Sequence, residues 1–522
     1  MSGLRKIYGP PGCGKTTRLM QIVEEHLPRF GPERIGFVSF TRAARREAKQ
    51  RAVAAFQCDE AQLRHFATLH SIAFHAVHAT RDEMVTDSKA IREAIGSAAG
   101  LAVSNAAPRS LDGDLDDTSA TSREKGDTVL ALWDFARNTM APLEDAWRHT
   151  GICELSLDRV RWFVDRYETW KAAEGRLDFT DLLLQALDES VDLPALGLLC
   201  LDEAQDLSPL QWRMFHKLAA TASHVVAAAD DDQAVYEFQG ADPAIFNRLP
   251  GGEEVLGQSY RLPRRVHAMA QRMIRRNRNR RDKTFEPRDD DGAVSQIDGL
   301  DELPIGDNGR WLILCRTNYQ LAEVHRHLID RGVVYWSKRS GPMRSHAKLR
   351  AYLTAQKLYD VQEVSAGDWA ALAAHLKPTV HLERGWKTKL KRGHYARDGR
   401  VHINNLWTTW GAADGLVDAI QTGTHTFLTG EDFDFYRRVE KLHGLTALEE
   451  TPHVAVSTIH GAKGSEADHV ILSNGITRRI EDSMAMQMEP ERRVWYVGAT
   501  RAKRNLYVWS QGGRLTPRWG EW

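Results

Sequence analysis

No run of eighteen apolar residues occurs in the sequence, which excludes a membrane-spanning helix. The chain enters an apolar segment at Ile7 and Tyr8 almost at once, so no signal peptide is expected. Cysteine is scarce, and none of the five forms a CxxC pair (Cys13, Cys58, Cys153, Cys200 and Cys315). This spacing argues against a zinc or iron–sulfur site and for a reducing compartment, so we expect a cytoplasmic protein with no membrane partner.

The chain also lacks a net charge, because 70 Lys and Arg side chains balance 70 Asp and Glu side chains. A protein that coats duplex nucleic acid is usually basic, so this balance argues against such a coat but leaves room for a local binding groove. The 522 residues exceed what one hydrophobic core can organise, and several domains are expected.

A glycine-rich loop stands near the N-terminus. The residues Gly9-Pro10-Pro11-Gly12-Cys13-Gly14-Lys15-Thr16 fit the pattern G-x4-G-K-[ST] in full. The apolar pair Ile7 and Tyr8 predicts a strand before it, and the run from Thr17 to Leu27 predicts a helix after it. In that context the backbone N–H groups face phosphates, Lys15 reaches the β- and γ-phosphates, and Thr16 holds Mg²⁺. The alternative is a chance glycine-rich turn.

Two further apolar runs end in acidic residues. Leu198 to Leu201 predicts a buried strand that leads into Asp202, a ligand for Mg²⁺, and Glu203, which would activate the attacking water. The alternative role for Asp202 is to cap a helix. His224 to Ala229 predicts a second strand that leads into Asp230, Asp231, Asp232 and Gln233. We expect these carboxylates to meet a metal, a phosphate or water, or to form a solvated turn, and Gln233 to sense the γ-phosphate or the attacking water.

The order of these and later segments resembles the superfamily 1 helicases, within them the UvrD/Rep-like branch. The matching segments are 39–44 (SFTRAA), 68–71 (TLHS), 178–183 (DFTDLL), 202–206 (DEAQD), 230–241 (DDDQAVYEFQGA), 258–261 (QSYR), 458–466 (TIHGAKGSE) and 496–502 (YVGATRA). They follow the family order from residue 9 to about residue 503. The form of 458–466 is that of the branch whose members move 3′ to 5′.

The resemblance implies an α/β fold of two RecA-like P-loop lobes, parallel sheets flanked by helices, with two compact and mostly helical inserted domains. The expected boundaries are 1–80 and 175–262 for the first lobe, 81–174 for its insertion, 263–345 and 451–522 for the second lobe, and 346–450 for its insertion. ATP and Mg²⁺ are expected between the lobes.

The resemblance also assigns individual roles. Arg261 and Arg501 match arginine fingers, which act across a cleft, so the expected catalytic residues are Glu203, Gln233 and these two arginines. Glu466 matches the residue that binds ribose, and Tyr260 the aromatic that stacks on adenine; a capped turn and a core tyrosine are the alternatives. Expected DNA contacts are Phe40, Thr41, Thr68, His70, Tyr236, Phe238 and His460, although Phe40 also suits a core position.

Four features depart from the family pattern. No glutamine precedes Gly9 to read adenine, so either base selectivity is relaxed or Arg18 and Tyr260 provide it; Thr17 is a further expected ATP contact. Segment 238–240 reads Phe-Gln-Gly where relatives have Trp-Arg-Gly, which predicts a weaker grip on DNA. Both insertions are compact, and the sequence ends soon after 496–502, so no nuclease domain is expected.

The remaining segments give coarser expectations. Residues 106–127 predict a mobile loop, and 160–173, 348–359 and 431–442 predict helices. Arg264 to Lys283 predicts a helix with a buried stripe at Val266, Met269, Met273 and Ile274, its arginines forming a solvated face or a nucleic-acid patch. The basic and aromatic stretch 384–400 lacks helical periodicity. It is either a contact with duplex DNA or a solvated surface.

The function expected from these features is an ATP-dependent DNA helicase or translocase that moves 3′–5′ on single-stranded DNA. Its partners would be single-stranded DNA and junctions with duplex DNA, with any protein partners bound through the insertions. The alternative is a DNA-stimulated ATPase switch that does not unwind, within a larger repair, recombination or phage-related complex.

Overall fold

The protein is described by a computed structural model that covers residues 3–39, 42–104, 124–150, 154–302, 305–306, 309–337, 343, 346–395, 398–423 and 425–510. The chain divides into two compact units. One contains Met1–Gly299, Leu314–Tyr319 and Thr458–Trp522, and the other contains Leu300–Ile313 and Gln320–Ser457. Within the described ranges, no helix has the length and apolar character needed to cross a membrane.

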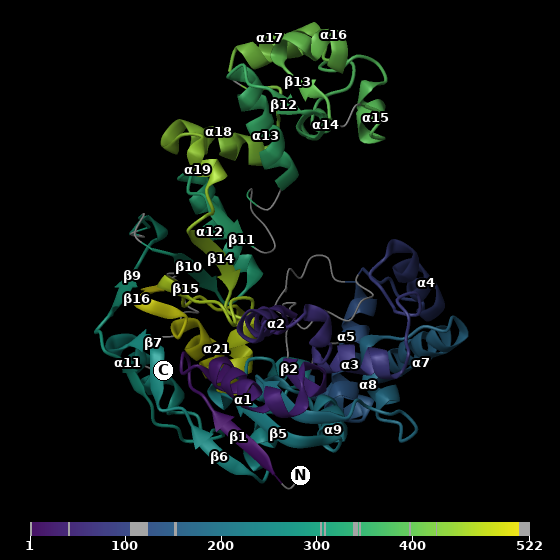
Figure 1. Cartoon of the computed structure of the whole chain (residues 1–522), viewed down its shortest axis with the longest axis vertical. Coiled ribbons are helices and arrows are strands. Elements are labelled where there is room, and N and C mark those ends of the chain that lie inside the picture. The colour runs from purple at the N-terminus through teal and green to yellow at the C-terminus, as the bar shows by residue number, and fades with distance from the viewer. Residues whose placement is uncertain are drawn as a thin grey trace. The chain divides into compact units, whose positions relative to one another are not determined.

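The first unit contains a six-stranded sheet in the order β3-β2-β4-β5-β1-β6, and its pairings are parallel. The strands are β1 (Leu4–Tyr8), β2 (Ile35–Ser39), β3 (Phe66–Ala67), β4 (Leu196–Asp202), β5 (Ala222–Ala229) and β6 (Gly252–Val255). Figure 1 shows β1, β5 and β6 side by side. The associated helices are α1 (Lys15–Phe30), α2 (Arg42–Phe56), α3 (Leu69–Ala76), α8 (Phe179–Ala186), α9 (Pro209–Ala219) and α10 (Pro243–Arg248).

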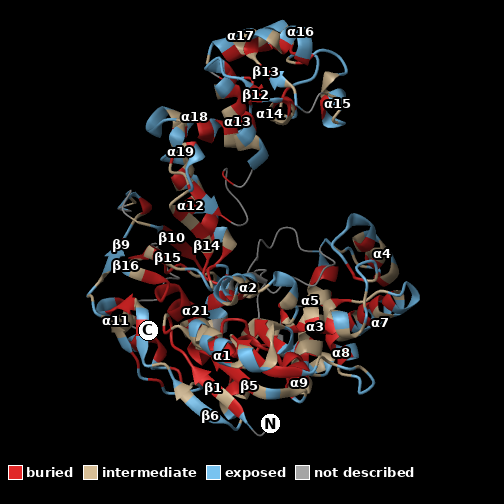
Figure 2. Cartoon of the chain, in the orientation of Figure 1, coloured by how far each residue is buried: buried red, intermediate tan, exposed pale blue. Residues whose placement is uncertain are grey.

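Burial explains why this sheet forms. Strands β2 and β4 are buried along their whole length, as a parallel strand covered on both faces requires. Helix α1 places Leu19, Ile22 and Val23 in the same core and leaves its other face exposed (Figure 2). The carboxyl ends of β1, β4 and β5 therefore present the loop before α1, Asp202 and Asp230 at one edge of the sheet.

A second six-stranded sheet has the order β11-β14-β10-β15-β16-β9. Its strands are β9 (Ala293–Ile297), β10 (Trp311–Cys315), β11 (Tyr335–Ser337), β14 (Val454–Thr458), β15 (Ala467–Ser473) and β16 (Ala502–Trp509). A separate parallel pair joins β7 (Gln258–Pro263) to β8 (Glu286–Arg288). Nearby helices are α11 (Arg264–Ile274), α12 (Asn318–Asp330), α20 (Arg478–Met486) and α21 (Met488–Ala499). The predicted α/β class with two parallel sheets flanked by helices is confirmed, and it is consistent with two RecA-like lobes.

Two mostly helical segments have cores of their own. In the first unit, α4 (Lys89–Ala99), α5 (Lys125–Thr139), α6 (Leu143–Thr150) and α7 (Leu157–Ala173) share one core. In the second unit, another core is shared by α13 (His346–Tyr359), α14 (Ala366–Ala373), α15 (Trp386–Lys391), α16 (Leu406–Trp410), α17 (Asp414–Gln421), α18 (Glu431–His443), α19 (Thr446–Glu449) and the antiparallel pair β12 (Val364–Ser365) and β13 (Arg400–Val401). The division of the chain into four parts stays a prediction.

The three helices predicted at 160–173, 348–359 and 431–442 are confirmed by α7, α13 and α18. Two expectations need correction. Lys125 to Asp127 begin α5 rather than a loop, because Asp127 turns inward and accepts a hydrogen bond from the Ser104 N–H at 2.9 Å; residues 105–123 lie outside the described ranges. Trp386–Lys391 forms a helix that buries Leu390, although three of its other positions are lysines.

Candidate nucleotide-binding and catalytic site

The loop between β1 and α1 has a backbone that favours glycine at two positions. Gly12 and Gly14 have φ angles of 73° and 78°, in the left-handed region. Gly14 is also the N-cap of α1 and brings no side chain of its own to the first N–H groups of that helix. Lys15 folds back along the loop and donates to the Gly9 carbonyl oxygen at 2.9 Å. A Cβ at Gly9 would lie 2.0 Å from Lys15 Cγ, so that glycine is required as well.

Thr16 and Asp202 meet at the end of β4. The Thr16 hydroxyl donates to Asp202 Oδ2 at 2.7 Å. Burial, and then the neighbouring Glu203, raise the pKa of Asp202 to about 6. A hydroxyl and a carboxylate side by side are oxygen ligands of the kind that Mg²⁺ prefers, so these two residues fit the metal.

Glu203 has a left-handed backbone with a φ of 56°, uncommon for a residue other than glycine and frequent at functional sites. Its N–H donates to Asp202 Oδ1 at 3.0 Å, and its carboxylate lies 3.9 Å from Lys15 Nζ. Burial alone would raise the pKa of Glu203, but Lys15 and Lys463 outweigh it and hold the pKa below its usual value. The carboxylate is therefore ionised at neutral pH and able to accept a proton.

Two residues that the sequence did not single out complete this side of the site. Lys463 Nζ pairs with the Asp206 carboxylate and donates to the Gln233 carbonyl oxygen at 2.8 Å. Burial raises the pKa of Asp206 to about 7, although Lys463 opposes the rise. Both residues lie inside segments that resemble the family motifs, 202–206 and 458–466. The sequence alone did not show that they pair, because the contact forms only in the folded chain.

The two predicted arginine fingers lie at the same site. Arg501 is buried; its Nη2 donates to Gln233 Oε1 at 2.8 Å and its Nε donates to the Val497 carbonyl oxygen at 2.9 Å. Burial, and then the Arg261 charge, lower the pKa of Arg501 to about 9. Arg261 Nε donates to Glu466 Oε2 at 2.8 Å, and Lys503 pairs with the same carboxylate. Glu466, the expected ribose ligand, is thus bound to two cations.

Strand β7 contacts the glycine-rich loop directly. The Ser259 hydroxyl donates to the Pro11 carbonyl oxygen at 2.7 Å, and the Tyr260 N–H donates to the Gly12 carbonyl oxygen at 2.9 Å. Tyr260 itself is 72% exposed, so its ring is free of the core, as a stacking role requires. Thr17 is exposed, while Arg18 pairs with Glu254 at 3.1 Å.

The three carboxylates after β5 correct a sequence-based expectation. Asp230, Asp231 and Asp232 are buried, with at most 1% exposure, so they do not form a solvated turn. They pair with Lys283 and Arg280, and their oxygens lie close enough together to bind a metal ion as well. The arginine-rich stretch around α11 therefore has two kinds of cation: Arg264, Arg265 and Arg272 are exposed, and Lys283 is buried.

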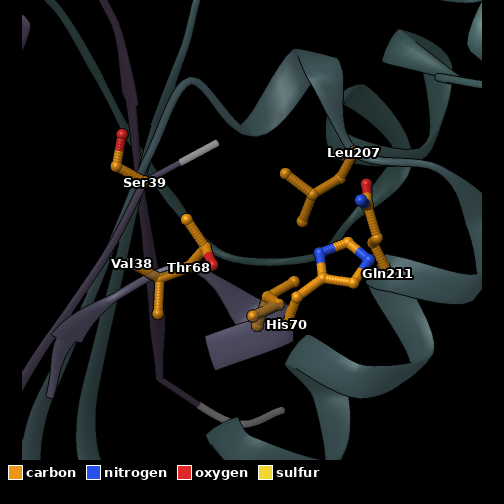
Figure 3. Close-up of a pocket in the computed structure, with 7 residues that line it drawn as sticks. Val38, Ser39, Thr68, His70, Leu207 and Gln211 are labelled. Atoms are coloured by element: carbon orange, nitrogen blue, oxygen red, sulfur yellow. The ribbon is translucent and has the colours of Figure 1, made fainter. Parts of the chain in front are cut away.

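Among the predicted DNA contacts, Phe40 and Thr41 lie outside the described residues. Thr68 and His70 line a pocket with Val38, Ser39, Leu69, Leu207 and Gln211. Figure 3 shows the His70 ring lying toward the Gln211 side chain. The His70 ring also packs edge-on against Phe179, with 5.9 Å between centroids.

The other three predicted DNA contacts form an aromatic cluster. The Phe238 and His460 rings meet edge-on at 5.4 Å, and Tyr236 lies 6.2 Å from Phe238. Tyr236 and His460 are buried, whereas Phe238 is half-buried. Phe238 is therefore the ring in this cluster best placed to offer a face to a base.

The chain matches known helicase families in sequence. Two family models match: the UvrD/REP helicase N-terminal domain over residues 2–251, and the UvrD-like helicase C-terminal domain over residues 439–511, together more than half of the chain. The chain is similar to the helicase-family protein YjcD of Bacillus subtilis, with 22% identity over 95% of this chain and 75% of that protein. It is also similar to DNA helicase II of Rickettsia typhi (24% identity; 68% of each chain) and to ATP-dependent DNA helicase UvrD2 of Mycobacterium tuberculosis (25% identity; 67% of this chain and 55% of that protein).

Proposed function

This chain belongs to the UvrD/REP helicase family, whose members are superfamily 1 ATP-dependent DNA helicases, and we propose that it moves 3′–5′ along single-stranded DNA and uses ATP hydrolysis to separate strands. The observation that carries the proposal is the convergence of Lys15, Glu203 and Arg501 on one edge of the first sheet. Arg501 reaches Gln233 there across 268 residues of sequence. An ATP site completed by remote arginines suits a motor, because their approach and withdrawal can be coupled to movement.

The chemistry follows from the contacts. The glycine-rich loop and Lys15 bind the β- and γ-phosphates, and Thr16 with Asp202 would hold Mg²⁺, which neutralises phosphate charge when bound. Glu203, ionised at neutral pH, orients the attacking water and accepts its proton. Arg261 and Arg501 stabilise the negative charge that develops on the transferred phosphoryl group.

Gln233 connects this chemistry to the aromatic cluster. Its side chain accepts a hydrogen bond from Arg501, and its carbonyl oxygen accepts one from Lys463. Lys463 Nζ in turn lies 5.1 Å from the centre of the Tyr236 ring. A change at the γ-phosphate can therefore reach the aromatic cluster through contacts already present, and Phe238 would stack on a base of the bound strand.

The direction of movement rests on the form of 458–466, and the four-part division into lobes and insertions belongs to the same proposal. The first test is ATP hydrolysis with and without single-stranded DNA. We expect DNA to stimulate wild type, Lys15→Ala to lose hydrolysis, and Glu203→Gln to bind ATP without turnover. Phe238→Ala should need more DNA for half-maximal stimulation and keep the DNA-free rate. Full hydrolysis by Lys15→Ala would contradict the proposed site.

A further inference from the structure

Three consecutive carboxylates are buried where β5 ends. Asp230, Asp231 and Asp232 are 0%, 0% and 1% exposed. Adjacent buried carboxylates are strongly unfavourable unless cations and hydrogen bonds compensate them. The compensation comes from the segment after α11, about fifty residues further along the chain.

Lys283 provides most of that compensation. Its Nζ lies 2.9 Å from Asp230 Oδ1 and 3.1 Å from Asp232 Oδ2, and it also pairs with Asp231. Burial alone would lower the pKa of Lys283, but the three carboxylates outweigh it and raise that pKa well above its usual value. Arg280 is the second cation, and its Nε and Nη2 donate to the two oxygens of Asp232 at 2.8 and 2.7 Å. Asp231 Oδ2 also accepts from Asn247 Nδ2 at 3.0 Å and from the Arg281 N–H at 2.5 Å.

Asp230 joins this ionic cluster to the hydrolysis site. While Oδ1 accepts from Lys283, Oδ2 accepts from Gln233 Nε2 at 2.5 Å. The Asp230 N–H donates to Gln205 Oε1 at 2.9 Å, and Gln205 Nε2 donates to the Glu203 carboxylate. Lys283 is therefore two hydrogen bonds from Gln233 through the Asp230 carboxylate.

We propose that Lys283 is a positioning residue for ATP hydrolysis, which fixes the Asp230 carboxylate so that Gln233 holds its catalytic orientation. The proposal rests on the roles proposed above for Gln233 and Glu203. Asp230 is held at both oxygens by different partners. Without Lys283, Oδ1 keeps only the longer bond from the Asp232 N–H, at 3.3 Å, so the carboxylate is held less firmly and can move Gln233 with it. Small displacements of this kind reduce turnover strongly while leaving phosphate binding by Lys15 intact.

Arg280 provides a matched control. It is also mostly buried and cationic, but it bonds Asp232, whose carboxylate makes no bond to Gln233 or Gln205. We would compare Lys283→Met and Arg280→Met by thermal unfolding, by KM for ATP, and by kcat at saturating ATP and single-stranded DNA. Both variants should unfold at lower temperature than wild type. Lys283→Met should lose kcat by ~10-fold or more with KM within about threefold of wild type, and Arg280→Met should stay within about twofold in kcat.

Equal kcat values for the two variants would overturn the proposal. If Lys283→Met does not fold, Asp230→Asn decides the question, since an amide cannot accept from Lys283 and Gln233 with both of its groups. Reduced kcat in Asp230→Asn supports the proposal, and wild-type kcat overturns it. Glu203→Gln is measured alongside: wild-type hydrolysis there would contradict the proposed function, whereas an inactive Glu203→Gln with a fully active Lys283→Met would contradict only the role of Lys283.

Discussion

Arg501 Nη2 donates a hydrogen bond to Gln233 Oε1 over 2.8 Å, joining the helix–strand turn before β16 to the turn after β5. Arg501 Nε also donates to the Val497 carbonyl oxygen, so the planar guanidinium is held by bonds from separate nitrogens in different directions. A lysine carries all its N–H donors on a single nitrogen, so it cannot reproduce bonds made from two separate nitrogens of the guanidinium.

Arg501→Lys is therefore expected to lower kcat for ATP hydrolysis by ~10³-fold, the scale of an arginine finger, while a fluorescent ATP analogue still binds. Steady-state hydrolysis at saturating DNA measures this. The control is Arg504→Lys, because the Arg504 side chain is 64% exposed and pairs with Asp468. A wild-type kcat in Arg501→Lys would remove Arg501 from the catalytic set.

Tyr260→Ala should raise KM for ATP by roughly tenfold, about 1.4 kcal/mol, and leave kcat nearly unchanged, because stacking on the base binds ground state and transition state alike. The exposed ring contributes little to the core, so the unfolding temperature should not change. Tyr260→Phe retains the ring and should behave as wild type. KM values for ATP and GTP in the three proteins provide the measurement, and an unchanged KM in Tyr260→Ala would exclude stacking.

Gly240 lies where α5 approaches the end of segment 230–241. Its φ is 92°, and a Cβ there would lie 2.8 Å from Thr139 Cγ2. Gly240→Ala should thus destabilise the protein by ~1–3 kcal/mol, through backbone strain and this contact together. Urea unfolding measures the change. Adding Thr139→Ser should recover only the steric part, and Gly252→Ala, where no atom lies within 4 Å of the added Cβ, should have little effect.

His425 should make stability depend on pH. The residue is fully buried, its Nε2 lies 2.8 Å from Gln356 Oε1, and burial followed by the Arg437 charge lowers its pKa from 6.5 to about 4. Between pH 6.5 and pH 4 this histidine is protonated in the unfolded chain but neutral in the folded chain. The free energy of unfolding therefore falls as the pH drops from 6.5 to 4, and it levels off below pH 4.

The size of that loss is up to about 3 kcal/mol from this group alone. Because other groups titrate as well, the informative quantity is the difference between wild type and His425→Asn, measured by urea unfolding at pH 7, 5.5 and 4. Asparagine tolerates the left-handed backbone at this position, where φ is 48°. The variant should lose less stability on acidification than wild type; parallel curves would show that His425 does not titrate in this range.

Local signals in the sequence were enough to predict the strands that position the site. Strands β4 and β5 are apolar runs that end in acids, and the glycine-rich loop lies between a strand and a helix as its motif requires. These features depend only on residues that are neighbours in the sequence, so they can be predicted without a structure. Arg501 was predicted by resemblance, since nothing local distinguishes it from other arginines.

Local sequence patterns could not predict ion pairs between distant segments. Lys463 and Asp206 are 257 residues apart, and Lys283 and Asp230 are 53 apart. Without knowledge of these partners, three adjacent aspartates after β5 suggested a metal, a phosphate or water, and the lysine that neutralises them looked like one more surface cation. Helix α15 was missed because one buried leucine, Leu390, is too few for a periodic pattern.

The most direct test of the central claim is unwinding of duplexes that carry either a 3′ or a 5′ single-stranded tail, with ATP and Mg²⁺, by wild type and Glu203→Gln. The account predicts that wild type opens 3′-tailed duplexes only and that Glu203→Gln opens neither. Opening of 5′-tailed duplexes alone would contradict the proposed direction. Failure to open either duplex, with ATP hydrolysis still stimulated by DNA, would contradict strand separation and favour an ATPase switch that does not unwind.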